Sequence, residues 1–296
     1  MMSARFLTVV LERAFNMRDG FGREIDYMRI SVIDSCNLNC YYCNPCDNNE
    51  HCHALNILSV KEVLCIVRAA TRLGIKHFRL TGGEPLLHPQ LDEMVLQIKK
   101  IPGVSSVSLT TNAVLLAQHA KWLKEAGIDS INVSLDTIDA SEYERITKKP
   151  LLEEVKHGIN AAIECGIRVK INVVLTTQTD VVALTRYVAK KGTDIRFIEM
   201  MPVGEGHTNG VEPYKKVIGT LSKLYGEPCR INTEKTKEIN SGNDKRKIPD
   251  NGPAEYYIFP ELGIRVGLIQ AIHGKFCATC NRIRVTADGR LMPCLG

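Results

Sequence analysis

The chain has 296 residues, of which 44% are hydrophobic and 24% are charged, and its formal net charge is +5. At roughly 100–200 residues per domain, this length predicts one large domain, or one domain with a small appendage. The composition is that of a globular protein with a sizeable core, which excludes a coiled coil, a collagen, a disordered chain and a small disulfide scaffold. The mild positive charge suits an anionic small substrate as well as nucleic acid and decides neither.

Eleven cysteines are the first specific feature of the chain. No apolar run approaches the ~20 residues that span a bilayer. The apolar stretch Phe6–Leu11 is followed directly by Glu12 and Arg13, and it lacks a basic start and a cleavage site. We therefore predict no secretory signal. We therefore expect a soluble, cytoplasmic protein that binds no membrane. In a reducing compartment, cysteines serve metal binding or catalysis more often than disulfides.

Six apolar, β-rich segments alternate with longer segments of helical spacing. The strands are expected at Met28–Ile33, His77–Leu80, Ser105–Thr110, Ser130–Leu135, Arg168–Leu175 and Asp194–Ile198. The helices are expected at Val60–Leu73, Gln90–Lys100, Leu116–Ala126, Leu151–Cys165 and Asp180–Lys191. This alternation predicts an α/β protein of parallel units whose sheet is covered on both faces. Six units are too few for a closed eight-fold barrel, so we expect a partial (β/α)6 TIM-like barrel with its sites at the strand C-terminal ends.

The pattern changes after Met201. Pro202–Gly210 predicts a connector, Tyr214–Tyr225 an amphipathic helix, and Tyr256–Leu291 short strands joined by turns. The basic triplet Lys245-Arg246-Lys247 is interpreted as a solvated loop rather than a nucleic-acid site. We divide the chain into an N-terminal extension (1–25), a barrel (26–205) and a C-terminal region (206–296).

The first cysteine motif follows the first strand directly. Cys36, Cys40 and Cys43 have the spacing C-x3-C-x2-C. Three thiolates on one loop can hold three irons of a [4Fe–4S] cluster and leave the fourth iron open for a substrate. A structural zinc site that borrows His51, Cys46 or Cys52 is the alternative.

A glycine-rich turn ends the second strand with the sequence Gly82-Gly83-Glu84-Pro85. The glycines allow a ligand close to the backbone, and Glu84 can accept a hydrogen bond from a cationic amine. The cysteine triplet and this turn together resemble the radical S-adenosylmethionine (SAM) enzymes. The resemblance implies that SAM binds the open iron and is split by one electron into methionine and a 5′-deoxyadenosyl radical.

A second cysteine motif lies near the C-terminus. Cys277, Cys280 and Cys294 have the spacing C-x2-C-x13-C. Alone, this motif with His273 fits a zinc ribbon equally well. Beside a radical SAM core, an auxiliary [4Fe–4S] cluster with an open iron is favoured.

The two motifs together resemble the GTP 3′,8-cyclase family, the first enzymes of molybdenum cofactor biosynthesis. Further landmarks are Asp26-Tyr-Met-Arg-Ile-Ser-Val, Arg79-Leu-Thr-Gly-Gly-Glu-Pro, Asn132-Val-Ser-Leu-Asp, Lys170-Ile-Asn-Val-Val and Arg196-Phe-Ile-Glu-Met-Met-Pro-Val-Gly. The resemblance implies hydrogen abstraction at C3′ of GTP, attack of that carbon on C8 of guanine, and a second cluster that anchors the guanine.

The resemblance also implies individual contacts. The SAM-binding positions are Tyr42, Gly83, Glu84, Ser134 and Met201. The GTP-binding positions are Arg29, Arg79, Thr110, Lys170, Arg196, Arg282, Ile283 and Arg284. The four cations expected within the barrel strands are Arg29, Arg79, Lys170 and Arg196, where an unpaired charge is costly unless it faces a ligand.

The implied partners are GTP, an electron donor such as a flavodoxin or ferredoxin, and a downstream cyclic pyranopterin monophosphate synthase, with a homodimer left open. No nucleic-acid partner is expected. Two other interpretations stay open: a peptide-modifying radical SAM enzyme with an auxiliary cluster, and a zinc-binding module without activity.

Several positions depart from the family pattern. Ala113 stands where glycine is usual, His77 stands where a lysine is common, and the loop after Cys43 carries Cys46, His51, Cys52 and His53. The chain ends two residues after Cys294, whereas family members continue to a Gly-Gly tail, which implies either a truncated chain or an impaired or altered enzyme, such as a truncated inactive paralogue. Cys65 and Cys165 are predicted core residues, and Cys229 has no predicted role.

Overall fold

A computed structural model describes residues 17–43, 56–202, 210–231 and 252–294. The histidines and cysteines at 46, 51, 52 and 53 and the basic triplet at 245–247 lie outside these residues. Among the described residues, no helix has the length and apolar character needed to cross a membrane.

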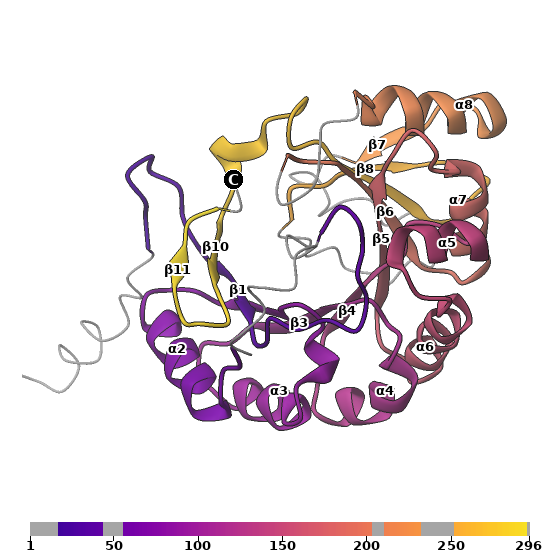
Figure 1. The fold of residues 1–296 in the computed structure, drawn as a ribbon. Helices are drawn as coiled ribbons and strands as arrows, with labels where there is room; N and C mark the ends of the chain where they lie inside the picture. The colour runs from indigo at the N-terminus through magenta and orange to yellow at the C-terminus, as the bar shows by residue number, and fades with distance from the viewer. Residues whose placement is uncertain (1–16, 44–55, 203–209, 232–251, 295–296) are drawn as a thin grey trace, which may run out of the picture.

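The described chain folds around one sheet that curves, with helices packed on its outer side (Figure 1). The first six strands are β1 (Tyr27–Ser31), β2 (His77–Thr81), β3 (Ser106–Thr111), β4 (Ser130–Ser134), β5 (Val169–Leu175) and β6 (Asp194–Glu199). Neighbouring strands in this series pair in parallel. The predicted strands are therefore confirmed in order and type, with shifts of one or two residues at their ends.

The C-terminal strands extend this sheet at both edges, which the sequence did not predict. They are β7 (Cys229–Ile231), β8 (Glu255–Ile258), β9 (Arg265–Ile269), β10 (Arg282–Val285) and β11 (Leu291–Met292). Strand β10 pairs in parallel with β1, and β9 pairs in parallel with β6. Eight parallel strands of the described residues thus form the curved wall, with antiparallel strands beyond each end. The partial barrel is confirmed, and it is wider than six units.

The helices cover the outer face of the wall in chain order. They are α2 (Val60–Arg72), α3 (Leu91–Lys99), α4 (Leu116–Glu125), α5 (Ala140–Thr147), α6 (Leu152–Glu164), α7 (Val181–Lys190) and α8 (Gly219–Tyr225), which follows a π-helical turn at Tyr214–Ile218. Two short 3-10 turns lie at Pro85–Leu87 and Phe276–Thr279. Helix α5 was not expected. Its local signal is Asp139, whose carboxylate accepts the N–H of Glu142 at 2.8 Å as an N-cap.

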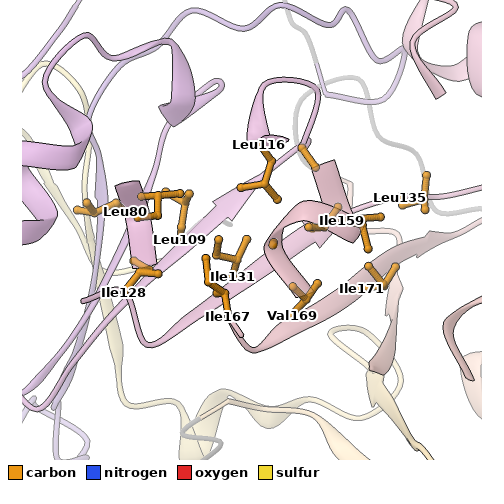
Figure 2. Packing of buried hydrophobic residues seen from close by; sticks show 14 of the residues in the cluster. Leu80, Leu109, Leu116, Ile128, Ile131, Leu135, Ile159, Ile167, Val169 and Ile171 are labelled. Atoms are coloured by element: carbon orange, nitrogen blue, oxygen red, sulfur yellow. The ribbon is translucent and has the colours of Figure 1, made fainter. Parts of the chain in front are cut away.

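The core lies between the sheet and these helices. Figure 2 shows strand residues such as Leu109, Ile131 and Ile171 packed toward Leu116 and Ile159 of the covering helices. Alternate residues of each strand supply this layer, because successive side chains of a strand point to opposite faces. The other face of the strands is left for the barrel interior.

One predicted core residue is wrong. Cys65 is exposed, because the inner stripe of α2 is formed by Val63, Val67 and Ala70, and position 65 falls between them. Cys165 packs against the core at the end of α6 but stays partly exposed.

Candidate active site

The first cysteine triplet lies on the loop that leaves the C-terminal end of β1. The N–H groups of Asn39 and Tyr41 donate to the carbonyls of Thr147 and Ile146, at 3.0 and 3.1 Å, which docks the loop on the end of α5. The N–H of Cys43 donates to the carbonyl of Cys40 at 3.0 Å and turns the C-x2-C segment back on itself. A helix that sequence reasoning missed therefore supports the loop.

The three thiols share one electrostatic environment. Burial, followed by Asp136 and the other two cysteines, raises the pKa of Cys40 to about 12. Burial is also the largest cause of the raised pKa values of Cys36 and Cys43. Deprotonating these buried, neighbouring thiols is unfavourable unless a bound cation compensates the negative charge. Metal binding here would therefore release protons. The residues fit an iron–sulfur cluster on this ground.

The described residues contain no group of three or more His, Cys, Asp or Glu side chains close enough to hold a single metal ion. A cubane cluster places its ligand sulfurs on separate irons, so they lie further apart than around one zinc ion. The zinc alternative borrowed His51, Cys46 or Cys52, which lie outside the described residues, so it stays untested.

The Gly83–Glu84 turn packs directly against this loop. The N–H of Gly83 donates to the carbonyl of Ile33, and that of Glu84 to the carbonyl of Ser35, both at 2.8 Å. A Cβ atom on Gly83 would lie 2.1 Å from the Ser35 carbonyl oxygen. Glycine is required here by this close approach.

The Glu84 side chain is 1% exposed, and its carboxylate is hydrogen-bonded to other residues of the chain. Its carboxylate accepts hydrogen bonds from the N–H of Leu86 at 3.0 Å, the Thr111 hydroxyl at 2.7 Å and the Asn112 N–H at 2.7 Å. Burial raises the pKa of Glu84. Its contact with an amine of SAM stays a prediction.

The other SAM positions lie at the same end of the strands. Tyr42 and Ser134 line a small cavity of about 40 Å³ together with Cys40, Asn112 and Asp136. Ser134 ends β4, and Met201 lies two residues beyond the end of β6. The structure brings Tyr42, Ser134 and Cys40 together around this cavity, and Met201 is not one of its lining residues.

The barrel interior holds a larger cavity of about 490 Å³. Five predicted GTP-binding residues line it: Arg29, Arg79, Lys170, Arg196 and Arg282. Thr110 adjoins it and accepts a hydrogen bond from Arg79 Nη1 at 3.3 Å. Arg284 and Ile283 lie on β10 outside the lining, and Ile283 packs against the core.

The cations in the cavity crowd one another. Burial lowers the pKa of Arg29 to about 9, and the neighbouring Arg79, Arg282 and Arg284 add to this effect. The Nε atoms of Arg29 and Arg282 are buried and have no hydrogen-bond partner among the described residues. A buried donor without a hydrogen-bond partner is energetically costly, so we expect these two Nε atoms to donate to an anionic ligand.

Sequence reasoning missed several polar residues of this cavity, including Tyr27, Ser108, Asn132, Arg168 and Asn172. Tyr27 accepts a hydrogen bond from Arg79 Nε, and Asn172 Oδ1 accepts one from Arg196 Nε at 2.9 Å. The available signal was their alternation, because polar residues occupy every second position of β1, β3 and β4, and positions 170 and 172 of β5. The cavity also reaches the N-terminal starts of β3 and β4, further than expected, since small serines at 106, 108 and 130 leave the interior unfilled.

The second cysteine triplet lies at the opposite end of the strands from the first. Cys280 precedes β10, whose first residue Arg282 pairs with Tyr27 at the start of β1. Strand β11 runs antiparallel to β10 and ends at Met292, opposite Arg284 and two residues before Cys294. A five-residue strand spans about 17 Å, so the cavity-lining residues of β1 and β10 lie between the two triplets.

Comparisons with known proteins agree with this site. The radical SAM superfamily model matches residues 30–183, and the Molybdenum Cofactor Synthesis C model matches residues 193–296. The GTP 3′,8-cyclase of Clostridium perfringens (strain SM101 / Type A) is 37% identical over 94% of this chain and 83% of its own length. The GTP 3′,8-cyclase of Pelotomaculum thermopropionicum is 38% identical over 94% of this chain and 84% of its own.

Solved structures show the same fold at low sequence identity. Streptococcus suis SuiB bound to S-adenosylmethionine matches with a TM-score of 0.64 at 15% identity, over 92% of this chain and 60% of the SuiB chain. Methylornithine synthase (PylB) matches with a TM-score of 0.54 at 17% identity, over 77% of this chain and 71% of its own. Together with the sequence comparisons, these matches establish that the chain belongs to the radical SAM superfamily and, within it, to the GTP 3′,8-cyclase family.

Proposed function

We propose that this protein is a radical SAM GTP 3′,8-cyclase, which converts GTP to (8S)-3′,8-cyclo-7,8-dihydroguanosine 5′-triphosphate in molybdenum cofactor biosynthesis. The observation that carries the proposal is the interior cavity, in which six Arg and Lys side chains, five of them predicted to bind GTP, line one space between the two cysteine triplets. Relatives with 37–38% identity over 94% of the chain bear this activity in their names.

The cavity chemistry supports a nucleoside triphosphate as the substrate. Guanidinium groups bind phosphate oxygens in pairs, and the buried Nε atoms of Arg29 and Arg282 offer such donors. A polyanion would offset both the burial and the neighbouring positive charges that lower the pKa of Arg29. Arg79, Lys170 and Arg196 are the other predicted GTP-binding residues that line the cavity, and Thr110 lies beside it.

Two clusters fit the two triplets. Cys36, Cys40 and Cys43 would hold one [4Fe–4S] cluster, and Cys277, Cys280 and Cys294 would hold the other. When bound, the reduced first cluster and SAM supply the one-electron chemistry that removes the C3′ hydrogen of GTP. Tyr42, Gly83, Glu84, Ser134 and Met201 would bind and orient SAM at the C-terminal ends of the strands. The second triplet would anchor the guanine, with Arg282, Ile283 and Arg284 beside it.

The wall of eight parallel strands contributes by enclosing the substrate. Arg29 and Arg79 lie on the inner positions of adjacent strands and are paired in register, so both can hold one ligand without moving. Holding GTP between the two ends of the strands would orient its ribose toward the first triplet and keep water from the reacting carbon.

The partners follow from this chemistry. The enzyme needs a one-electron donor, for which a flavodoxin or ferredoxin is suited, and its product would pass to a cyclic pyranopterin monophosphate synthase. We place the reaction in the cytoplasm, because free thiols are kept reduced there. A homodimer is compatible with this function, as is the division of the chain at 205/206 into a barrel and a cluster-binding region.

The test is anaerobic reconstitution followed by assay with GTP, SAM and a reductant. We expect about eight irons per chain and conversion of GTP to the cyclised nucleotide. Arg282→Ala should abolish GTP binding and leave reductive SAM cleavage intact, whereas Arg72→Ala, on the exposed end of α2, should change neither. Cleavage of SAM without consumption of GTP by the unaltered protein would refute the proposal and point to another substrate, such as a peptide.

A further inference from the structure

Residues 17–25 form a tight hairpin directly before β1. The N–H of Ile25 donates to the carbonyl of Met17 at 2.8 Å, and the N–H of Gly22 donates to the carbonyl of Asp19 at 2.9 Å. Gly22 has a φ of 76°, which glycine adopts without strain. The Asp19 carboxylate accepts the N–H groups of Phe21 and Arg23 at 3.0 and 2.9 Å, so the turn is fixed by its own side chain.

Arg23 links this hairpin to the second cysteine triplet. Its Nε and Nη2 contact Asp19 Oδ2 at 2.6 and 2.5 Å. Its Nη1 donates to the backbone carbonyl of Cys277 at 2.6 Å, across 254 positions of sequence. Asp19 therefore holds one edge of the planar guanidinium and directs another nitrogen at the cysteine.

The carbonyl that Arg23 binds is the one that closes the C-x2-C turn. It also accepts the N–H of Cys280 at 3.2 Å. The next residue is held as well, because Asn281 Nδ2 donates to Asp26 Oδ1 at 2.6 Å, and the Asn281 carbonyl accepts the N–H of Tyr27 at 3.2 Å. The N-terminal segment thus contacts the turn at its first cysteine, Cys277, and at Asn281, directly after its second cysteine.

The charge of Arg23 also lies close to these two cysteines. The pKa of Arg23 is raised, chiefly by its hydrogen bond to Asp19, and further by the charges of Asp19, Cys280 and Cys277. Ligands of a metal centre are commonly oriented by hydrogen bonds from residues behind them, and nearby positive charge raises the reduction potential of an iron–sulfur cluster.

We propose that Arg23 is a positioning residue for the second cluster: it fixes the Cys277–Cys280 turn through the Cys277 carbonyl and places a permanent positive charge beside the two thiolates. Asp19 orients Arg23. The inference rests on the proposed function, because it takes the second triplet to bind a [4Fe–4S] cluster. It gives the N-terminal hairpin a task in cluster binding that no motif in the sequence indicated.

The experiment isolates the second triplet in the full chain. Replacing Cys36, Cys40 and Cys43 by serine removes the first triplet and keeps Cys277, Cys280 and Cys294 as the one intact triplet that is predicted to bind a cluster. In this background we compare the parent with Arg23→Gln, Arg23→Lys, Asp19→Asn and the control Arg18→Gln, which alters an exposed residue of the same hairpin. The readouts are iron and sulfide per chain, the rate of iron release to a chelator, and the midpoint potential from an EPR-monitored titration.

The parent should bind about four irons. Arg23→Gln should release iron roughly 10–100-fold faster and show a more negative midpoint potential, because a positive charge is removed. Arg23→Lys should keep the parent potential, because lysine retains the positive charge. It should release iron faster, because an ammonium group cannot bind Asp19 and the Cys277 carbonyl with the separate nitrogens of a planar guanidinium. Asp19→Asn should lie between the parent and Arg23→Gln in release rate, and Arg18→Gln should match the parent.

Equal release rates and equal potentials for Arg23→Gln and Arg18→Gln would overturn the inference while the proposed function stands. If the parent itself bound no iron, the second-cluster part of the proposed function would fail instead. Circular dichroism of the iron-free chains checks folding. If Arg23→Gln does not fold, Arg23→Lys decides alone, and a release rate equal to that of the parent overturns the inference.

Discussion

The hydroxyl of Tyr42 donates a hydrogen bond to Asp136 Oδ2 over 2.5 Å. Asp136 Oδ1 in turn accepts the N–H of Val174 on β5 at 2.8 Å. Because Tyr42 lies between Cys40 and Cys43, this carboxylate joins the first cysteine loop to the ends of two strands. Burial raises the pKa of Asp136 to about 6, whereas its hydrogen bonds from Tyr42 and Val174 act to lower it. The charged form of this buried carboxylate is therefore stabilised by these two hydrogen bonds.

Replacing Tyr42 by phenylalanine should loosen the first cysteine loop. The change leaves Asp136 Oδ2 without its donor, which costs about 1–3 kcal/mol in the free energy of unfolding of the iron-free chain. Urea denaturation measures this loss, and iron analysis should show lower occupancy at the first triplet. Tyr214→Phe, on an exposed tyrosine, is the control and should change neither quantity. Equal stability of the two variants would contradict the assigned role of the pair.

Adding a methyl group at Gly83 should displace the loop of the first triplet. A Cβ atom there meets the backbone of Ser35 at 2.1 and 2.4 Å and that of Asp34 at 2.5 Å, and backbone atoms yield little. We expect Gly83→Ala to lower bound iron from about eight to about four per chain, with the second cluster kept. EPR of the reduced protein distinguishes the two clusters, and an unchanged iron content would show that the loop can move aside.

Helix packing gives a matched pair of glycine substitutions. A Cβ atom on Gly158 of α6 would lie 2.3 Å from the Ala113 carbonyl oxygen and 3.0 Å from Leu116 Cβ, whereas one on Gly219 of α8 meets nothing within 4 Å. Gly158→Ala should therefore destabilise the chain by about 1–3 kcal/mol. Gly219→Ala, at a helical φ of −61°, should stabilise it by about 0.5–1 kcal/mol. Denaturant titration of both variants measures the difference, and the same sign for both would contradict the packing described.

The buried His88 should make stability fall in mild acid. Its Nε2 donates to the Leu58 carbonyl at 3.0 Å, so its Nδ1 is the atom that accepts the N–H of Gln90 at 3.1 Å. Burial lowers the pKa of His88 below its usual value of 6.5. The unfolded chain then binds the proton more tightly than the folded chain, so stability is complete above about pH 6.5 and is lost as the pH falls toward the folded pKa.

The slope from one such histidine is at most about 1.4 kcal/mol per pH unit. Denaturant titrations of the iron-free chain at several pH values below 6.5 measure it, and His88→Asn should show a shallower fall than the parent. His77, whose pKa burial also lowers, contributes in the same direction and remains in both proteins. Parallel pH profiles for the two chains would rule out this role of His88.

Local sequence signals gave the six strands and most helices of the barrel. Their residues carry the required pattern themselves, with apolar strands and amphipathic helices that differ in period. Helix α5 was missed because it is short, although Asp139 and Glu142 mark its start. The exposed Cys65 was misjudged because the sequence alone left the exact inner stripe of α2 open.

Only some of the residues that line the interior cavity could be predicted from the sequence. Arg29, Arg79, Lys170 and Arg196 could be named from their place in strands, whereas Asn132 and Asn172 could not, because a polar residue in a strand has many ordinary uses. Their common cavity depends on the register between strands, which joins Asn132 to Lys170 and Asn172 to Arg196.

The sequence by itself determined the motifs from which the ligands and the chemistry are predicted: two cysteine triplets of fixed spacing, a glycine-rich turn, and cations within the strands. Only the tertiary structure decided where they meet. Strands β9 and β10 join opposite edges of the sheet, and β10 lies beside β1 although more than 250 positions separate them. Such pairing is set by how the whole sheet curves and which edges remain free, and these properties do not exist in any local stretch of chain. For the same reason, the hold of Arg23 on Cys277 was visible only after folding.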